Sequence, residues 1–230
     1  MEKHSETTKN SFLVVNNMQQ TVQKLASSKN VTIVLDNSGL EHFNDLLLAD
    51  YLTSEFGINV TFECKQFPWF VSDVTIPDFK VLLGQLEQSN SFKLEALATK
   101  WSNYLDNSRS RQWTIRNDPF WTLPHSYWKL PDDEIISSPS LRKDSCDFIV
   151  FKGDLNYRKV VFDAKWPTTT PFKQAIGPLL HSGIAPFVML RTCKADVCVG
   201  LADDQEHELT QRDPNWMVNG KFGVIQGCFD

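Results

Sequence analysis

The stretch Val31-Thr32-Ile33-Val34-Leu35-Asp36-Asn37-Ser38-Gly39 decides the fold of this chain. Its first five residues form a short, continuous apolar run rich in β-branched side chains, which is typical of a strand buried on both faces. The run stops abruptly at Asp36, and a helical pattern follows over residues 42–55. Residues 58–64 are again strand-like. A strand, a helix and a strand in this order predict the βαβ unit of a parallel sheet.

The rest of the chain repeats these two patterns. Helical spacing of apolar residues recurs at 12–27, 78–88 and 92–105. Further strands are expected at 147–152, 186–190, 196–201 and 222–226. The polar residues 1–11 predict a flexible tail, and residues 12–230 are expected to form one domain. We therefore predict an α/β fold, namely a largely parallel, three-layer α/β/α sheet domain.

Residues 101–140 form an aromatic, proline-punctuated insertion. This segment holds four of the seven tryptophans, at positions 101, 113, 121 and 128, and prolines at 119, 124, 131 and 139. The pattern is neither cleanly helical nor strand-like. A packed cover over one sheet edge is the favoured interpretation, and a wall of an active-site cleft is the alternative.

Composition limits the class of protein. The chain has 230 residues, of which 41% are hydrophobic and 22% charged, as in an ordinary globular domain. A net charge of −5 argues against a nucleic-acid partner. No apolar signal region or membrane-length run is present, and the five cysteines show no paired spacing. We expect a cytoplasmic protein with reduced thiols and no membrane partner; its protein partners are not indicated.

Three oxygen-bearing side chains follow two of the predicted strands. Asp36 and Asn37 come directly after the first strand, and Asp73 follows the strand at 58–64 after a short loop. Ligands of open parallel sheets bind outside the carboxyl ends of the strands. Carboxylate and amide oxygens suit Mg²⁺ or Mn²⁺. By spacing alone, Asp36 is equally well explained as a helix cap, and a turn or cap role is the stronger explanation for Asp73.

Other polar residues follow the later strands. Asp154 and Asn156 come after the strand at 147–152, and Arg191 and Lys194 after the strand at 186–190. An arginine and a lysine placed in this way can clamp a phosphate, although a solvated surface pair is the ordinary outcome. Glu41 lies one helical turn beyond Asn37 and either faces the same pocket or forms a capping box with Ser38.

Several familiar catalytic motifs are absent. The sequence contains no GxGxxG or GxxxxGK[ST] motif, so neither a dinucleotide-binding fold nor a P-loop ATPase is indicated. It also lacks GxSxG and HExxH.

Four segments, taken in order, resemble one family. They are 35–41 (LDNSGLE), 68–73 (PWFVSD), 151–159 (FKGDLNYRK) and 190–196 (LRTCKAD), with a closing segment at 216–226. Together they resemble the damage-control phosphatases of the DUF89 fold, in the subfamily marked by an Arg-Thr-x-Lys motif. Members are also described as acidic residue methyltransferase 1-like proteins or sugar phosphate phosphatases. The resemblance runs from about residue 12 to the C-terminus.

The resemblance implies a metal-dependent phosphatase. Its substrates would be small phosphorylated metabolites such as fructose 1-phosphate, and its metal Mn²⁺, Mg²⁺, Co²⁺ or Ni²⁺. The matching metal ligands are Asp36, Asn37 and Asp73. The matching substrate-binding residues are Asp36, Asn37, Arg191, Thr192, Cys193, Lys194, Ala195 and Lys221. Asp36 and Asp73 would act through the metal, whereas Asp154 and Asn156 would position the attacking water or substrate hydroxyls.

Two alternatives accompany this hypothesis. The family has also been credited with S-adenosylmethionine-dependent carboxyl methylation, for which Glu41 and Asp73 match the proposed cofactor positions. No glycine-rich methyltransferase loop supports it here. Relatives usually carry a large helical region before the first strand, whereas about 30 residues precede it here. We expect part of the substrate pocket to be missing and apolar surface to be exposed, so a non-catalytic domain that binds metal and phosphosugar is the second alternative.

Overall fold

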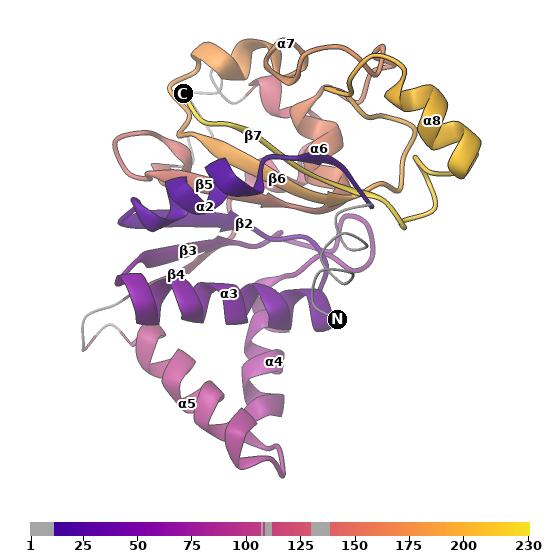
Figure 1. Ribbon diagram of the computed structural model, residues 1–230. Coiled ribbons are helices and arrows are strands. Elements are labelled where there is room, and N and C mark those ends of the chain that lie inside the picture. The colour runs from indigo at the N-terminus through magenta and orange to yellow at the C-terminus, as the bar shows by residue number, and fades with distance from the viewer. Residues whose placement is uncertain (1–11, 107, 109–111, 130–138) are drawn as a thin grey trace. The chain divides into compact units, whose positions relative to one another are not determined.

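A computed structural model describes residues 12–106, 108, 112–129 and 139–230. The tail expected at 1–11 lies outside these residues, as does part of the segment 101–140. The described strands form a seven-stranded sheet in the order β1-β7-β6-β5-β2-β3-β4. The sheet is mostly parallel and is accompanied by helices (Figure 1). The predicted α/β fold class is therefore confirmed.

The described residues divide into two compact units, which we describe separately. Unit 1 comprises residues 1–23, 125–137 and 150–230, and unit 2 comprises residues 24–124 and 138–149. Helix α2 (Met18–Ala26) and strand β5 (Phe148–Lys152) each contain residues of both units.

Unit 2 contains the predicted βαβ unit. Its main elements are β2 (Asn30–Val34), α3 (Leu40–Phe56), β3 (Asn59–Glu63), α4 (Ile76–Glu87), α5 (Phe92–Leu105) and β4 (Trp113–Arg116). The three strands pair in parallel, and β2 matches β3 from Asn30 opposite Asn59 to Val34 opposite Glu63. Figure 1 shows α4 and α5 side by side as a helical hairpin. The four residues 31–34 are all buried, as expected for a strand covered on both faces.

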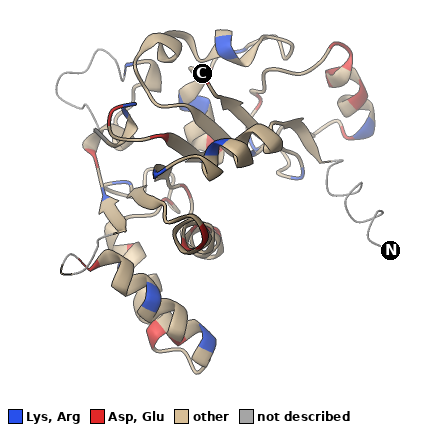
Figure 2. Ribbon diagram, turned by 60° about the vertical axis from the view of Figure 1, so that its left-hand side comes forward, with Lys and Arg blue, Asp and Glu red and all other residues tan. Residues whose placement is uncertain are grey.

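In unit 1, the strand formed by residues 223–228 near the C-terminus lies between two other strands. Its main elements are β1 (Leu13–Asn16), α6 (Gly153–Val160), α7 (Phe172–Ala175), β6 (Phe187–Thr192), α8 (Gln205–Arg212) and β7 (Gly223–Cys228). Strand β7 pairs in parallel with β1 and antiparallel with β6. Figure 2 shows acidic and basic positions together on α8.

Two sequence-based element predictions are wrong. Residues 12–27 were predicted as one helix, but residues 13–16 form β1 and only 18–26 are helical. The Asn16 side chain accepts a hydrogen bond from the backbone of Met18 at 3.0 Å, which marks the change. A strand was predicted at 196–201, yet this segment forms none. Side chains satisfy its backbone instead: Gln226 donates to the Val199 carbonyl at 2.8 Å.

The segment 101–140 contributes a strand that the sequence pattern did not predict. Residues 113–116 form β4, which lies at the end of the strand order and pairs with β3. The side chains of Trp101, Trp113 and Trp121 are fully buried. Trp113 donates a hydrogen bond to the Thr53 hydroxyl at 2.9 Å and packs edge-on against Phe62. Its aromatic residues therefore build the core of unit 2 rather than only covering it.

The described residues include no helix long and apolar enough to cross a membrane. All five cysteines, which lie among the described residues, are buried and outside any disulfide. Large exposed apolar side chains occur in unit 2, including Leu40 (77% exposed), Val71 (90%) and Phe92 (82%).

Candidate functional site

The carboxyl ends of β2 and β3 bring one group of predicted site residues together. Because Val34 lies opposite Glu63, continuing the same register by two residues places Asp36 beside Lys65. The segment around Val74 is hydrogen-bonded to the backbone of both residues. The backbone amide of Val74 donates a hydrogen bond to the Asp36 carbonyl. The Val74 carbonyl accepts a hydrogen bond from the backbone amide of Lys65, and both bonds are 2.8 Å long.

Asn37 links the members of this group. It forms an isolated antiparallel bridge with Asp73. Its side-chain amide nitrogen donates to the carboxylates of Asp36 at 2.8 Å and of Glu41 at 2.9 Å. Its amide oxygen accepts from the Ser72 hydroxyl at 2.6 Å. Asp36 and Asp73 are buried, at 7% and 3% exposed, so this end of unit 2 concentrates negative charge in a poorly hydrated place.

The structure separates these residues from the helix caps. Helix α3 begins after Gly39, which has a φ of 77° and makes no side-chain cap, so neither Asp36 nor Ser38 caps it. Helix α4 is capped by Thr75 in a capping box with Asp78. Asp73 does hold its own loop, because its carboxylate accepts the amide of Phe70 at 2.6 Å. The cap alternative is therefore wrong for Asp36, while the turn role of Asp73 is real.

Lys65 belongs to this group and was missed by the sequence interpretation. Its side chain is buried, and its ammonium group donates to the Leu35 carbonyl at 3.1 Å. The ammonium nitrogen also lies 5.6 Å from the centre of the Trp121 ring. Burial lowers the pKa of Lys65, while the charges of Asp73 and Asp36 raise it. A lysine at the end of an apolar strand, in register with Asp36, was the available signal.

Among the described residues, no cluster of three or more His, Cys, Asp or Glu side chains is arranged to hold a metal ion. The predicted set contains two carboxylates, and its third member is an amide. A metal ion at this place would therefore depend on the Asn37 amide oxygen and on water ligands.

The second group of predicted residues lies in unit 1 and is organised around Arg191. The guanidinium donates to the Asp154 carboxylate at 2.7 Å, to the Val197 carbonyl at 2.5 Å and to the Ala195 carbonyl at 3.1 Å. It also stacks over the Tyr157 ring at 4.2 Å. Its side chain is fully buried. Arg191 thus fixes the loop that follows β6.

The neighbours of Arg191 differ in what they present to solvent. Lys194 is exposed, and its backbone amide donates to the Asp154 carboxylate at 3.2 Å. Thr192 is exposed at the end of β6, and Ala195 is half-buried. Cys193 and Cys198 are both buried, and the interaction between their thiols lowers the pKa of Cys193 and raises that of Cys198.

Two further predicted residues of unit 1 are already paired. Asn156 is fully buried; its amide oxygen accepts from the Tyr127 hydroxyl and its amide nitrogen donates to the Lys152 carbonyl. Lys221 is exposed and forms an ion pair with Asp213 at 3.0 Å. The structure therefore anchors Asn156 inside the protein, whereas Lys194 and Lys221 remain accessible to a ligand.

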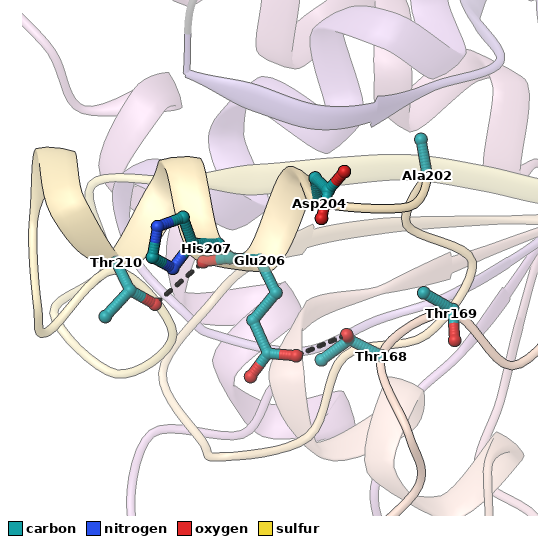
Figure 3. A pocket seen from close by; sticks show the side chains of 7 residues that line it. All are labelled: Thr168, Thr169, Ala202, Asp204, Glu206, His207 and Thr210. Carbon is teal, nitrogen blue, oxygen red and sulfur yellow. Dashed lines mark hydrogen bonds between the residues drawn. The ribbon is translucent and has the colours of Figure 1, made fainter.

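A depression of about 360 Å³ also lies in unit 1, against α8 (Figure 3). It is lined by Thr168, Thr169, Ala202, Asp204, Glu206, His207 and Thr210. The Thr168 hydroxyl donates to the Glu206 carboxylate at 2.6 Å, and the Thr210 hydroxyl to the Glu206 carbonyl at 2.8 Å. None of the predicted site residues lines this depression.

Comparison with known proteins identifies the family. A family model described as "Damage-control phosphatase ARMT1-like domain" matches residues 1–209. The human protein named Damage-control phosphatase ARMT1 is 41% identical over 214 residues, which cover 93% of this chain and 46% of that protein. Its namesake from Xenopus laevis is 38% identical over 226 residues, covering 94% and 50%.

A solved structure supports the fold. The crystal structure of a DUF89 family protein from Pyrococcus horikoshii matches with a TM-score of 0.50 and 13% identity, covering 98% of this chain and 56% of that one. The chain spans about half the length of the curated relatives it matches. It belongs to the damage-control phosphatase ARMT1-like family.

Proposed function

We propose that this chain is a metal-dependent phosphatase acting on small phosphorylated metabolites, with sugar phosphates such as fructose 1-phosphate as the first candidates. The observation that carries the proposal is that buried Asp36 and Asp73 meet half-buried Asn37 at the ends of β2 and β3, in a chain of this family. Whole relatives are about twice as long, so activity of this chain is itself part of the proposal.

The side chains fit a hard divalent cation in their chemistry. The amide nitrogen of Asn37, the positive end of its dipole, now lies between the carboxylates of Asp36 and Glu41. A cation favours the same surroundings. Rotating the amide by half a turn would direct its oxygen toward these carboxylates and its nitrogen toward Ser72, whose hydroxyl can accept as well as donate. Mn²⁺, Mg²⁺, Co²⁺ and Ni²⁺ all accept such oxygen ligands.

The protein's own groups would share the work of hydrolysis. Asp36, Asn37 and Asp73 would hold the metal, which polarises phosphoryl oxygens and orients water when it is bound. The exposed ammonium groups of Lys194 and Lys221 would bind the phosphate as point charges. Asp154 would support this step through the loop that it and Arg191 hold in place.

The test is phosphate release from a panel of sugar phosphates by the purified chain with Mn²⁺, Co²⁺, Ni²⁺ or Mg²⁺. We expect turnover with at least one metal and a loss of about 100-fold or more in kcat for Asp36→Ala, the size seen when a group stabilising transition-state charge is removed. Asp144→Ala, which removes an exposed carboxylate of the same unit, should retain activity.

A folded protein that releases no phosphate with any of these metals would refute the phosphatase. Binding of Mn²⁺ and phosphosugar without turnover would then favour the non-catalytic binding domain. Transfer of a labelled methyl group from S-adenosylmethionine to protein, abolished by Glu41→Ala, would favour carboxyl methylation instead.

A further inference from the structure

Lys65 has an environment that an ordinary lysine does not have. Its side chain is 1% exposed, and its ammonium group donates a hydrogen bond to the Leu35 carbonyl inside the protein. The Trp121 ring adds a second favourable but weak contact. Full charges act on the ammonium group from Asp73 and Asp36. The negative charges of these carboxylates stabilise the charged form of the buried ammonium group.

The balance of charge shows what Lys65 does for the site. Asp36 and Glu41 accept hydrogen bonds from the Asn37 side-chain amide, and Asp73 is bridged to Asn37 through the backbone, so this strand end carries three carboxylates. A divalent cation bound there would leave one negative charge, which repels an anionic phosphate. The ammonium group of Lys65 cancels that remaining charge from inside the protein, where screening by water and salt is weak.

We propose that Lys65 is a positioning residue that serves as the fixed internal counter-charge of the Asp36–Asp73 site. It allows the carboxylates to be buried together before a metal binds, and it makes the metal-loaded site receptive to phosphate at some cost in metal affinity. This inference rests on the metal site proposed above, but it concerns a residue that touches neither phosphate nor solvent.

The proposal predicts opposite effects on two ligands when the charge alone is removed. In Lys65→Met, which keeps an unbranched side chain one atom shorter and removes the charge, Mn²⁺ should bind about tenfold more tightly because a repulsive charge near a divalent ion has gone. Inorganic phosphate should bind the Mn²⁺-loaded variant about tenfold more weakly. Both constants can be measured by titration calorimetry on the full chain, without any assay of turnover.

Lys80→Met is the matched control, because Lys80 is an exposed lysine of α4 in the same unit. It removes the same charge from the chain and should change neither binding constant by more than about twofold, since exposed charges are screened. A purely structural role of Lys65 would loosen Mn²⁺ and phosphate together. Unchanged or weaker Mn²⁺ binding by Lys65→Met therefore overturns the proposal.

Stability provides the second measurement if Lys65→Met does not fold. The double variant Lys65→Met/Asp73→Asn removes one charge of each sign, so it should have a higher Tm, or a larger soluble fraction, than Lys65→Met alone. A double variant no more stable than the single one overturns the proposal. Wild-type protein that binds Mn²⁺ but releases no phosphate removes the proposed phosphatase and leaves this comparison intact, whereas wild-type protein that binds no Mn²⁺ overturns both.

Discussion

Two buried cations, one in each unit, show how differently a strand end can use a positive charge. Arg191 has its charge matched by the Asp154 carboxylate, and its remaining donors hold the carbonyls of Val197 and Ala195. The Lys65 ammonium group donates to the Leu35 carbonyl, and the carboxylates of Asp73, Asp36 and Glu63 that act on it carry more negative charge than one ammonium group neutralises. The planar guanidinium fork suits the first task and the compact ammonium group suits the second. Arg191, whose charge is neutralised by one carboxylate, stabilises a loop. The carboxylates near Lys65 exceed its single positive charge, so they can attract a further cation.

The largest expected effect is on the balanced side of this comparison. Arg191→Met should lower the free energy of unfolding by about 3–5 kcal/mol, because it leaves the Asp154 carboxylate without its partner and two carbonyls without their donor. Urea denaturation of the purified chain measures the loss. The exposed neighbour Lys194, changed to Met, should cost less than about 0.5 kcal/mol. A loss below about 1 kcal/mol for Arg191→Met would show that the pair does not hold the loop.

The next effect is a loss of stability at low pH that originates in unit 2. His42 is fully buried in α3, and within the described residues neither of its ring nitrogens has a hydrogen-bond partner. Burial lowers its pKa from 6.5 to about 4, against an opposing influence of Asp78. Because the unfolded chain takes up this proton at higher pH than the folded one, stability present above pH 6.5 should fall as the pH drops toward 4.

The size of this effect follows from the shift in pKa. The loss should reach roughly 3 kcal/mol at about pH 4 and below. His42→Phe, which can keep the edge contact with Phe79, should remove this component from the pH dependence of unfolding. Wild-type and variant curves that stay parallel between pH 6.5 and 4 would show that His42 is not its source.

Because unit 2 has more carboxylates than cations at this strand end, we expect bound metal to raise the free energy of unfolding, by somewhat less than the His42 effect lowers it. Mn²⁺ at about 100 times its Kd should stabilise the wild-type chain by about 2.7 kcal/mol. Asp73→Asn should lose this gain while the metal-free protein keeps or slightly increases its stability, since one of the crowded carboxylates has gone. Thermal unfolding with and without Mn²⁺ tests both parts. Full stabilisation of Asp73→Asn by Mn²⁺ would move the metal away from this strand end.

The smallest expected effect on stability is at an exposed pair of unit 1. Lys221→Met breaks the ion pair with Asp213, yet it should change the free energy of unfolding by less than about 0.5 kcal/mol because the lysine is solvated. If Lys221 binds phosphate as proposed, the KM for sugar phosphates should rise about tenfold or more at unchanged stability. An unchanged KM would restrict substrate binding to other residues.

Sequence patterns predicted best where burial and periodicity agree. The run 31–35 and the following helix appear as predicted because continuous β-branched residues and a clear helical spacing have few other solutions. The apolar residues of 196–201 are buried as well, but Arg191, Tyr157 and Gln226 satisfy backbone groups of this segment, so no strand partner is needed. The spacing of apolar residues predicts which residues are buried, but it does not predict which donor binds a given backbone carbonyl.

The candidate site was predictable in part for the same reason. Asp36 and Asn37 follow the end of β2 as the pattern predicts, and the carboxyl ends of parallel strands meet at one sheet edge. The contribution of Lys65 depends on register between two strands, which one strand's pattern does not reveal. The roles of Asn156 and Arg191 depend on partners as distant in sequence as Tyr127 and Asp154.

The position of β7 between β1 and β6 has a consequence for synthesis of the chain. Among the described strands β1 pairs with β7, which is synthesised about 210 residues after it. Unit 1 therefore closes after translation has reached residue 228, and β1 waits as an unpaired strand until then. A premature stop codon before residue 223 would remove the strand that pairs with β1, exposing a strand edge that favours aggregation and removal by proteases.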